Sequence, residues 1–345
     1  MQIFHSETTT ARKASAEFHG GRLLPPFESP ERVHMILSSL RAREIGDISL
    51  PTSHGMGPIR AIHDSGYVDF IEGVWKSWLA AGYEGEAMPF TWPTRHTRAA
   101  VPRNVIAQLG YYSFATDTAI EAHTCMAAKA SSDVALSALD YVRTTRKSAF
   151  GLCRPPGHHA SVDQFGGYCF FNNAAIAAQY ALSNGSERVA ILDIDCHHGN
   201  GTQQIFYKRS DVLYVSLHGD PAESFPYFLG YQDERGTESG IEANANYPLP
   251  VGTDYRLWSH TLIDSLDRIR EYEPDILIVS LGVDAYKDDP IGLFNLNSDD
   301  FTDCGGKIAK LGQPTVFLLE GGYAMHEIGT NVSNVLFGFD MARGA

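Results

Sequence analysis

Side chains that could bind a metal ion or carry a proton recur directly after apolar runs of this sequence. The motif RPPGHHA follows one apolar run, DCHHGNG follows a second, and SLGVDAY and EGGY end two more. The candidate residues at these four places are His158, His159, Asp195, His197, Asp284 and Tyr323. Any one of them alone is more often a helix cap or a satisfied polar residue. Unrelated capping roles would not gather all six at strand ends, so together they indicate a metal or acid-base site.

The spacing of Asp195 and His197 suits a single metal ion. Side chains two apart in an extended segment share a face, so these two can converge on one ion while Cys196 points away. Asp284 would supply a third ligand from another strand end. Three nitrogen and oxygen ligands leave a position open for water or substrate, which is typical of a catalytic metal site. These ligand types suit Zn²⁺ and also allow Fe²⁺ or Co²⁺.

The elements that must position these residues form an alternating pattern. Short apolar, β-branched runs predict strands buried on both faces, with helical patterns between them. The predicted strands cover 149–153, 189–195, 212–218, 276–282 and 315–321, and the predicted helices cover 171–182, 255–272 and 298–312. Such alternation predicts a parallel sheet with helices on both sides, whose ligands bind beyond the carboxyl ends of the strands. No repeat divides the chain, so we expect a single α/β domain over residues 1–345.

The composition of the chain limits the classes of molecule that it is expected to bind. The chain has 27 Lys and Arg against 41 Asp and Glu, a formal net charge of −14. That charge disfavours nucleic acid and favours small cationic ligands. No apolar stretch approaches the ~20 residues needed to cross a bilayer, and the five scattered cysteines include no CxxC pair. We therefore expect a cytoplasmic protein that binds no membrane.

The stretch 84–107 has no clear helical or strand period and contains three prolines, three arginines and Trp92. Long irregular segments of compact domains are usually functional, and Trp and Arg are enriched at interface anchors. We interpret it as a loop that shapes the site entrance at the interface of a homodimer or higher homo-oligomer. A flexible surface insertion is the alternative.

The motifs RPPGHHA, GGYCFFNNAA, LDIDCHHGNGTQ, SLH, SLGVDA and EGGY, in this order, resemble those of the histone deacetylase family. The resemblance covers essentially the whole chain and is strongest to the family's bacterial acetylpolyamine amidohydrolases. It implies the arginase/deacetylase α/β fold, with an eight-stranded parallel sheet flanked by helices. The implied activity is the zinc-dependent removal of acetyl groups from acetylated polyamines or diamines, such as acetylputrescine and acetylcadaverine.

The resemblance also implies roles for individual residues. Asp195, His197 and Asp284 correspond to the zinc ligands, and Tyr323 to the tyrosine that polarises the carbonyl. Gly321 and Gly322 would let this tyrosine swing in when substrate arrives.

The paired histidines of the family correspond to His158 and His159, with Asp193 behind the first and Asn200 behind the second. The carboxylate would keep His158 charged, whereas the neutral amide would leave His159 fit to act as a base. A helix-edge or turn carboxylate is the alternative for Asp193. The resemblance further implies a structural K⁺ held by Asp193, Ser216 and the backbone carbonyls of Asp195, His197 and Leu217.

Substrate-binding residues follow from the same resemblance. Tyr168, beside Gly167, and Phe225 match the aromatic walls of a narrow tunnel, although either aromatic could be core. Glu17 and Asp117 are candidates to meet a distal ammonium group, with solvated surface carboxylates as the alternative. Ile106 stands where the polyamine enzymes carry an additional acidic residue, which favours short diamines.

Three other functions are possible on this fold. A protein N-ε-acetyl-lysine deacetylase is the main alternative. An arginase-type ureohydrolase needs further carboxylates for a second ion, and this chain has Gly199 and Tyr286 at those positions. A non-enzymatic binding protein would be expected to lack at least one of the candidate metal or catalytic residues, and all are present.

Overall fold

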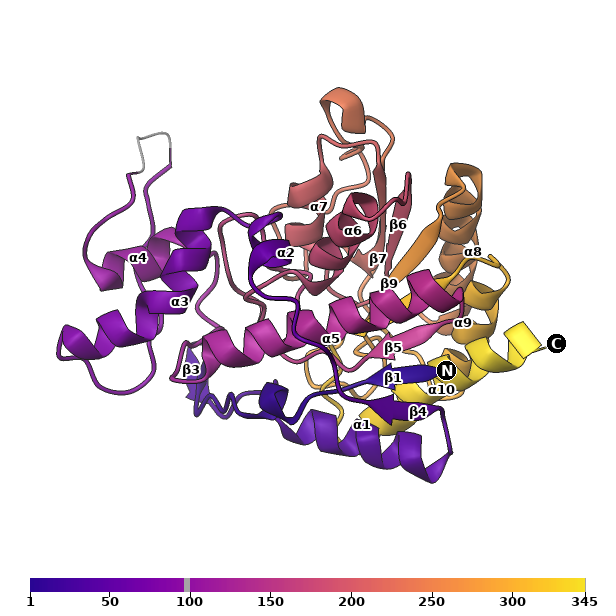
Figure 1. Ribbon diagram of the computed structural model, residues 1–345, viewed down its shortest axis with the longest axis horizontal. Coiled ribbons are helices and arrows are strands. Elements are labelled where there is room, and N and C mark those ends of the chain that lie inside the picture. The colour runs from indigo at the N-terminus through magenta and orange to yellow at the C-terminus, as the bar shows by residue number, and fades with distance from the viewer. Residues whose placement is uncertain (96–99, 345) are drawn as a thin grey trace.

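The computed structural model describes residues 1–95 and 100–344 (Figure 1). Its strands are β1 (Gln2–Phe4), β2 (Glu17–His19), β3 (Arg22–Leu24), β4 (Asp47–Ser49), β5 (Ala149–Gly151), β6 (Val189–Asp193), β7 (Val212–Gly219), β8 (Asn244–Leu249), β9 (Ile276–Leu281) and β10 (Thr315–Leu319). Its α-helices are α1 (Glu31–Ala42), α2 (Gly57–Arg60), α3 (Ser65–Ala80), α4 (Val105–Tyr111), α5 (Thr124–Thr145), α6 (Asn173–Ser183), α7 (Asn200–Phe206), α8 (Tyr255–Tyr272), α9 (Asp300–Ala309) and α10 (Ile328–Gly344). Short 3₁₀ helices cover Glu7–Thr10 and Glu238–Gly240.

The main sheet of the described residues has eight parallel strands in the order β4-β1-β5-β10-β9-β6-β7-β8. This confirms the expected α/β fold with an eight-stranded parallel sheet flanked by helices. All five strands predicted from apolar runs are present. Three of them, β5, β6 and β10, end two residues before the predicted boundary, because the chain leaves the sheet where the polar motifs begin.

The sequence patterns missed three strands of this sheet. β1 and β4 have three residues each, too few to show a period, and β8 contains two asparagines and a proline in place of an apolar run. All three lie at or next to an edge of the sheet, where little burial is needed on the outer side. These strands therefore need fewer apolar residues than the central strands, which is why no apolar run marks them.

Two apolar layers cover the sheet. Alternate residues of the strands point to opposite faces. On one face they pack against α1, α8, α9 and α10, and on the other against α2, α3, α5 and α6 (Figure 1). Within β6, for example, Ala190 and Leu192 belong to the first layer and Val189 and Ile191 to the second. Both faces of the sheet are therefore buried, and a ligand can reach the sheet only at the ends of its strands.

The predicted helix 255–272 matches α8, and the other two predicted helices are shorter in the structure. α6 begins at Asn173 because the side chain of Asn172 accepts the backbone N–H of Ala175. None of the described helices combines the length and apolar character required to span a bilayer.

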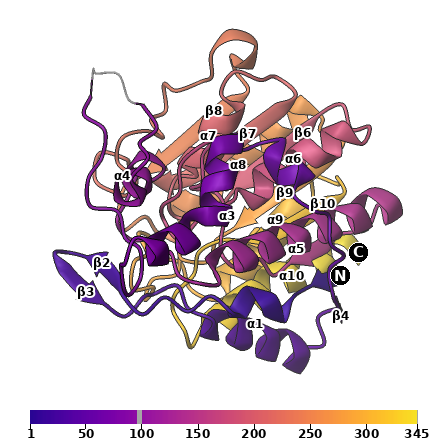
Figure 2. The ribbon, with the colours of Figure 1, turned by 60° about the vertical axis from the view of Figure 1, so that its left-hand side comes forward.

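The described residues of the stretch 84–107 are irregular up to Asn104, whose side chain caps α4, and the last three residues of the stretch are helical. Residues 96–99 of this stretch lie outside the described residues. A bridge between Ala87 and Ile120 attaches its first part to the body of the molecule. The antiparallel hairpin of β2 and β3 projects from the body in Figure 2.

Candidate active site

Four strands that are neighbours in the sheet deliver the candidate residues. In sheet order these are β5, β10, β9 and β6, although their order along the chain is different. His158 and His159 follow β5, Tyr323 follows β10, Asp284 follows β9, and Asp195 follows β6. The carboxyl ends of parallel strands meet at one edge, so residues up to 165 positions apart in the chain come together there.

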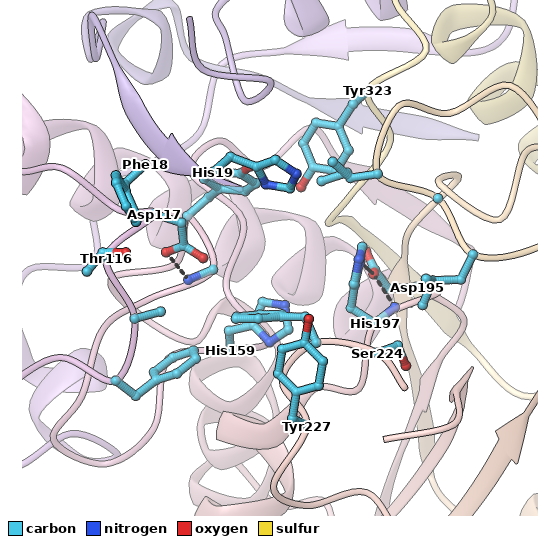
Figure 3. Close-up of a pocket in the computed structure, with 18 of the residues that line it drawn as sticks. Phe18, His19, Thr116, Asp117, His159, Asp195, His197, Ser224, Tyr227 and Tyr323 are labelled. Atoms are coloured by element: carbon cyan, nitrogen blue, oxygen red, sulfur yellow. Dashed lines mark hydrogen bonds and ion pairs between the residues drawn. The ribbon is translucent and has the colours of Figure 1, made fainter. Parts of the chain in front are cut away.

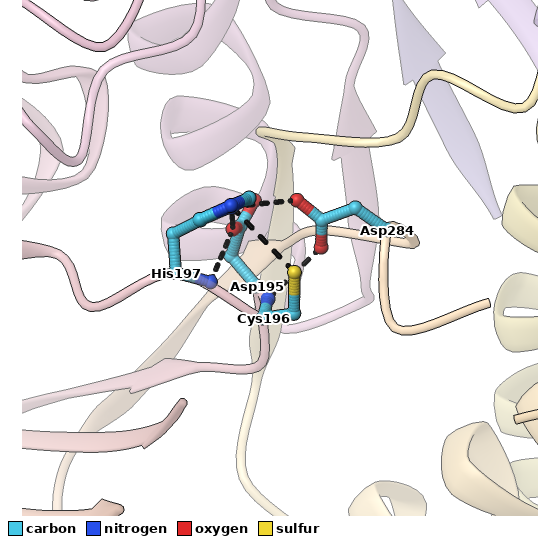
Figure 4. A group of neighbouring side chains, drawn as sticks. All are labelled: Asp195, Cys196, His197 and Asp284. Carbon is cyan, nitrogen blue, oxygen red and sulfur yellow. Dashed lines mark hydrogen bonds and ion pairs between the residues drawn. The ribbon is translucent and has the colours of Figure 1, made fainter. Parts of the chain in front are cut away.

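Asp195, His197 and Asp284 face one another in a buried cluster, which we call the metal-type group (Figure 4). The Nδ1 atom of His197 lies 3.2 Å from Oδ1 of Asp195 and 3.2 Å from Oδ2 of Asp284. Burial and the neighbouring charge of Asp195 raise the pKa of Asp284. Two buried carboxylates this close repel each other unless a cation lies between them. The donor set therefore fits a divalent ion, as the sequence predicted.

Backbone N–H groups fix the other oxygens of both carboxylates. Gly321 N–H donates to Oδ2 of Asp195 at 2.7 Å, and Cys196 N–H donates to Oδ1 of Asp284 at 2.9 Å. Such bonds orient metal ligands. A side chain at position 321 would collide with both carboxylates, since a Cβ atom there would lie 2.3 Å from Asp284 Oδ2. Glycine is required at this position by the close approach.

Cys196 corrects one expectation. Its side chain was expected to point away, but its Sγ atom lies 3.5 Å from Nδ1 of His197 and within the cluster. The chain turns out of β6 after Asp193, so the strict alternation of an extended strand no longer holds. Burial and the charge of Asp284 raise the pKa of this thiol well above its usual value. Cys196 does not line the cavity described below.

His158 and His159 stack side by side, with ring centroids 4.0 Å apart. His158 Nδ1 lies 3.0 Å from a carboxylate oxygen of Asp193, and His159 Nδ1 lies 2.7 Å from the amide oxygen of Asn200. Burial acts to lower the pKa of His158, but the charges of Asp193 and Asp195 outweigh it and raise this pKa to about 10. Burial and the charge of His158 hold the pKa of His159 well below its ordinary value. The two imidazoles therefore differ in charge, as expected from their backing groups.

Asp193 and Ser216 are register partners on β6 and β7, so their side chains lie side by side. Both oxygens of Asp193 are engaged: Oδ1 accepts the backbone N–H of Asp195 at 3.2 Å, and Oδ2 also accepts the hydroxyl of Tyr214 at 3.0 Å. The hydroxyl of Ser216 lies 2.8 Å from Nδ1 of His218. Asp193 is thus a fully buried strand-end carboxylate, contrary to the alternative of a helix edge.

A cavity of about 710 Å³ opens beside the metal-type group (Figure 3). Its walls come from the β2–β3 hairpin, the segment before α5, and the loops after the central strands. It is lined by Phe18, His19, Gly20, Trp92, Phe114, Ala115, Thr116, Asp117, His158, His159, Gly167, Tyr168, Asp195, His197, Glu223, Ser224, Phe225, Tyr227, Pro290, Ile291, Gly292, Leu293 and Tyr323. Most of the candidate residues named from the sequence therefore share one cavity.

Tyr323 lies across the cavity from His159 in Figure 3, next to the wall residue Tyr168 at a centroid distance of 5.6 Å. Arg32 donates through Nε to the carbonyl of Gly322 at 2.7 Å, and its guanidinium lies 4.8 Å from the Tyr323 ring. Asp289 accepts the backbone N–H of Tyr323 at 2.6 Å. The tyrosine was expected to swing in with substrate, but its backbone is already held on both sides.

The predicted aromatic walls are both present. Phe225 packs edge-on against His159, with ring centroids 5.2 Å apart, and Tyr168 lies on the Tyr323 side. The indole of Trp92, from the stretch 84–107, donates to the backbone oxygen of Ser113 at 3.1 Å and reaches the cavity. The irregular stretch thus contributes one residue, Trp92, to the lining of the cavity.

The two predicted ammonium anchors differ in position. Asp117 lines the cavity, and its Oδ1 accepts the N–H of Gly167 at 3.0 Å and the hydroxyl of Thr118 at 2.6 Å. Glu17 does not line the cavity itself, and its carboxylate accepts the N–H of Phe27 at 3.2 Å. It lies behind the wall residue Tyr168, where burial and the charge of Glu17 together raise the pKa of that phenol.

Ile106 lies on α4 and packs against the apolar layer around α3 and α5, so it is not a cavity residue of this chain either.

Sequence reasoning missed other polar residues of the site. Glu320 accepts the N–H of Gly157 at 2.6 Å, and Arg32 and Asp289 hold the Tyr323 loop. Glu223 and His19 line the cavity mouth. Glu320 belongs to the EGGY motif and could have been noticed there, but no local pattern marks the others, which reach the site only through the fold.

Comparisons with known proteins agree with this geometry. The histone deacetylase domain family matches residues 26–338. The chain is 48% identical to the acetylpolyamine amidohydrolase of Mycoplana ramosa, over 98% of this chain and 99% of that protein. It is 49% identical to acetylpolyamine amidohydrolase 1 of Pseudomonas aeruginosa, over 99% of both chains. The crystal structure of the acetylpolyamine aminohydrolase from Burkholderia pseudomallei superposes with a TM-score of 0.94 at 39% identity, covering 99% of both chains.

Proposed function

This chain belongs to the histone deacetylase family, and on that premise we propose that it is a metal-dependent amidohydrolase that removes acetyl groups from acetylated polyamines or diamines. The observation that carries the proposal is the arrangement of the side chains around one cavity. A buried carboxylate-imidazole-carboxylate group opens into it between a neutral imidazole and a phenol hydroxyl.

Asp195, His197 and Asp284 would hold one divalent ion, with Zn²⁺ preferred and Fe²⁺ or Co²⁺ possible by ligand type. When bound, the ion lowers the pKa of a water molecule and polarises the acetyl carbonyl. Backbone N–H groups hold both oxygens of Asp195 and one oxygen of Asp284, which presets the ligand geometry. Oδ1 of Asp195 and Oδ2 of Asp284 also face Nδ1 of His197.

His159 serves as the base and then as the acid. Its Nδ1 donates to the Asn200 carbonyl, so Nε2 carries the free lone pair. Nε2 accepts a proton from the attacking water as the water oxygen bonds to the acetyl carbon. The same proton then passes to the amine nitrogen as the carbon-nitrogen bond breaks, which returns His159 to its neutral form and leaves acetic acid and the amine. The second proton of the water stays on the acid until the amine takes it, so the products are acetate and the ammonium form of the amine. His158, kept charged by Asp193, is unsuited to accept a proton.

Tyr323 donates from its hydroxyl to the acetyl oxygen as negative charge develops there. A donor held in place before the reaction stabilises the transition state without reorganisation. Burial raises the pKa of this phenol well above its usual value, so it keeps its proton at working pH.

A structural K⁺ next to the site is part of the proposal. Asp193 and Ser216 on adjacent strands, with the backbone carbonyls of Asp195, His197 and Leu217, would surround it. The buried charge of Asp193 supports a monovalent cation at this place.

The substrate class follows from the cavity and the charge. The aromatic rings of Tyr168 and Phe225 line the cavity and suit an aliphatic chain, and Asp117 fixes the N–H of Gly167 in the same lining. The net charge of −14 attracts small cationic amides. We assign monoacetylated diamines as the preferred substrates, with Asp117 near the free ammonium.

Assembly and location complete the proposal. The stretch 84–104 and the loop after β7 expose large apolar side chains near the entrance, including Phe90 and Phe228. A second copy of the chain covering them would form a homodimer, or a higher homo-oligomer, with a narrowed entrance. None of the five cysteines, all within the described residues, forms a disulfide, which supports the cytoplasm as the compartment.

One panel of substrates tests the function. Acetylputrescine, acetylcadaverine, longer acetylpolyamines and acetyl-lysine peptides are compared by kcat/KM with the zinc-loaded protein. We expect the acetyldiamines to be hydrolysed fastest. Faster turnover of acetyl-lysine peptides than of every acetyldiamine would replace this function with protein deacetylation.

A further inference from the structure

We propose that Asp289 is the positioning residue of Tyr323, and that it sets where the phenol hydroxyl stands over the substrate carbonyl. The inference rests on the proposed function, because it needs Tyr323 to act in the hydrolysis. Nothing in the local sequence marks Asp289, which lies in the loop after β9, while Tyr323 lies in the loop after β10.

The contacts of Asp289 are directed at the Tyr323 loop. Its Oδ2 accepts the backbone N–H of Tyr323 at 2.6 Å and that of Ala324 at 3.0 Å. Its Oδ1 accepts the N–H of Ile291 at 3.2 Å. The residue is buried, so these N–H groups have little access to water as an alternative partner. One side chain therefore satisfies both consecutive N–H groups of the loop.

The peptide group between Gly322 and Tyr323 is held at both ends. Asp289 binds its N–H, and Arg32 binds its carbonyl oxygen at 2.7 Å. Gly322 has a φ of +127°, and a Cβ atom at this position would lie 2.5 Å from Cγ2 of Val283, so the loop takes this path only with glycine here. A peptide plane fixed in this way fixes the direction of the Cα–Cβ bond of Tyr323, and so the reach of its hydroxyl.

The same carboxylate also joins two walls of the cavity. Ile291, bound through Oδ1, lines the cavity, and Tyr323 lines it beside the metal-type group. Asparagine cannot replace these contacts, because its one amide oxygen cannot reach all three N–H groups and its NH₂ group would face a donor. The chemistry of this position calls for a carboxylate.

Kinetics in two backgrounds test the proposal. Asp289→Ala and Asp289→Asn are made in the parent and in Tyr323→Phe, and Asp288→Asn, at the exposed neighbouring carboxylate, is the matched control. In the parent, Asp289→Ala should lower kcat by roughly 10- to 100-fold with a smaller change in KM, because small misplacements cost about that much. In Tyr323→Phe the same change should cost less than about threefold. Asp289→Asn should fall between, and Asp288→Asn should match its background.

Hydrogen exchange gives a readout that does not depend on activity. Exchange of the segment 320–327 should speed up about tenfold or more in Asp289→Asn and stay unchanged in Asp288→Asn. Equal kcat losses in both backgrounds, or unchanged exchange, would overturn the positioning role.

Failure of the proposed function has a different signature. It would show as a parent protein inactive on every acetylated amine, while the exchange result still tests whether Asp289 holds the loop. A Tyr323→Phe variant as active as the parent would overturn the role of Tyr323 and this inference with it.

Discussion

Asp117→Asn separates charge from shape in the substrate cavity. The amide keeps an oxygen at the position of Oδ1, which accepts the N–H of Gly167 and the hydroxyl of Thr118. The substitution removes the negative charge of the carboxylate and puts an NH₂ group in place of Oδ2, the oxygen that neither donor uses. The fold and the position of Gly167 should therefore persist, while the attraction for a distal ammonium is lost.

The size of the effect follows from the half-buried position of Asp117. An exposed ion pair contributes up to about 1 kcal/mol, and a hydrogen bond to a charged group contributes about 1.5–3 kcal/mol. We take about 1.4 kcal/mol, which corresponds to about a tenfold change in an equilibrium or rate constant. The variant should lower kcat/KM for acetylputrescine about tenfold and leave N-butylacetamide, which has no ammonium, within about twofold.

The assay measures acetate release from both substrates at low and high ionic strength. Salt should shrink the difference between parent and variant, because a half-exposed pair is screened. Glu223→Gln, which removes an exposed carboxylate from the cavity mouth, is the control and should cost less than about twofold. An equal loss on both substrates would refute the charge role and leave Asp117 as a support for Gly167.

Four other outcomes are expected. Asp284→Ala should remove the metal and abolish turnover, and metal analysis of the parent should find one ion per chain; two ions, or full activity after chelation, would contradict the single site. Tyr323→Phe should keep the metal and lower kcat by about 10²–10³, with a smaller change in KM, in steady-state kinetics. His159→Ala should lose at least as much activity, and a mild loss would transfer the base role to His158. Glu17→Gln should leave the preference for acetyldiamines unchanged and raise the free energy of unfolding in urea by on the order of 1–3 kcal/mol at pH 8 but hardly at pH 4.5. Burial raises the pKa of Glu17 to about 7, so the parent protein keeps this side chain neutral at pH 4.5 and loses stability as the pH rises through 7 and the buried carboxylate becomes charged. The glutamine variant does not have this loss, and equal effects at both pH values would contradict the explanation.

The candidate residues that the sequence placed at one edge of the sheet share one property, which is that each follows the carboxyl end of a strand within a few residues. A parallel strand buried on both faces reads as a continuous apolar run, so its end is visible in the sequence. Asp195 and Asp284 could be placed in this way from the sequence alone. The sequence did not show that β5, β10, β9 and β6 are neighbours, because strand order depends on crossover connections.

The residues that were missed or misplaced depend on contacts between distant segments. Asp289 reaches Tyr323 across 34 positions, and Arg32 reaches Gly322 across 290. Glu17 carries a charge in a short hairpin strand, and its burial depends on how that hairpin packs. Cys196 was misplaced because the chain bends directly after β6, which periodicity alone cannot reveal.

The proposed division of work between the two histidines depends on a single difference behind them. Both rings are buried and nearly in contact, so burial alone would keep both neutral. Asp193 supplies a charge that outweighs the burial of His158, whereas Asn200 supplies only a dipole to His159. The resulting charge on His158 then lowers the pKa of His159 further, because like charges at this distance disfavour each other. The carboxylate behind one ring thus helps to keep the other ring neutral, and a neutral His159 is what the proposed reaction requires of its base.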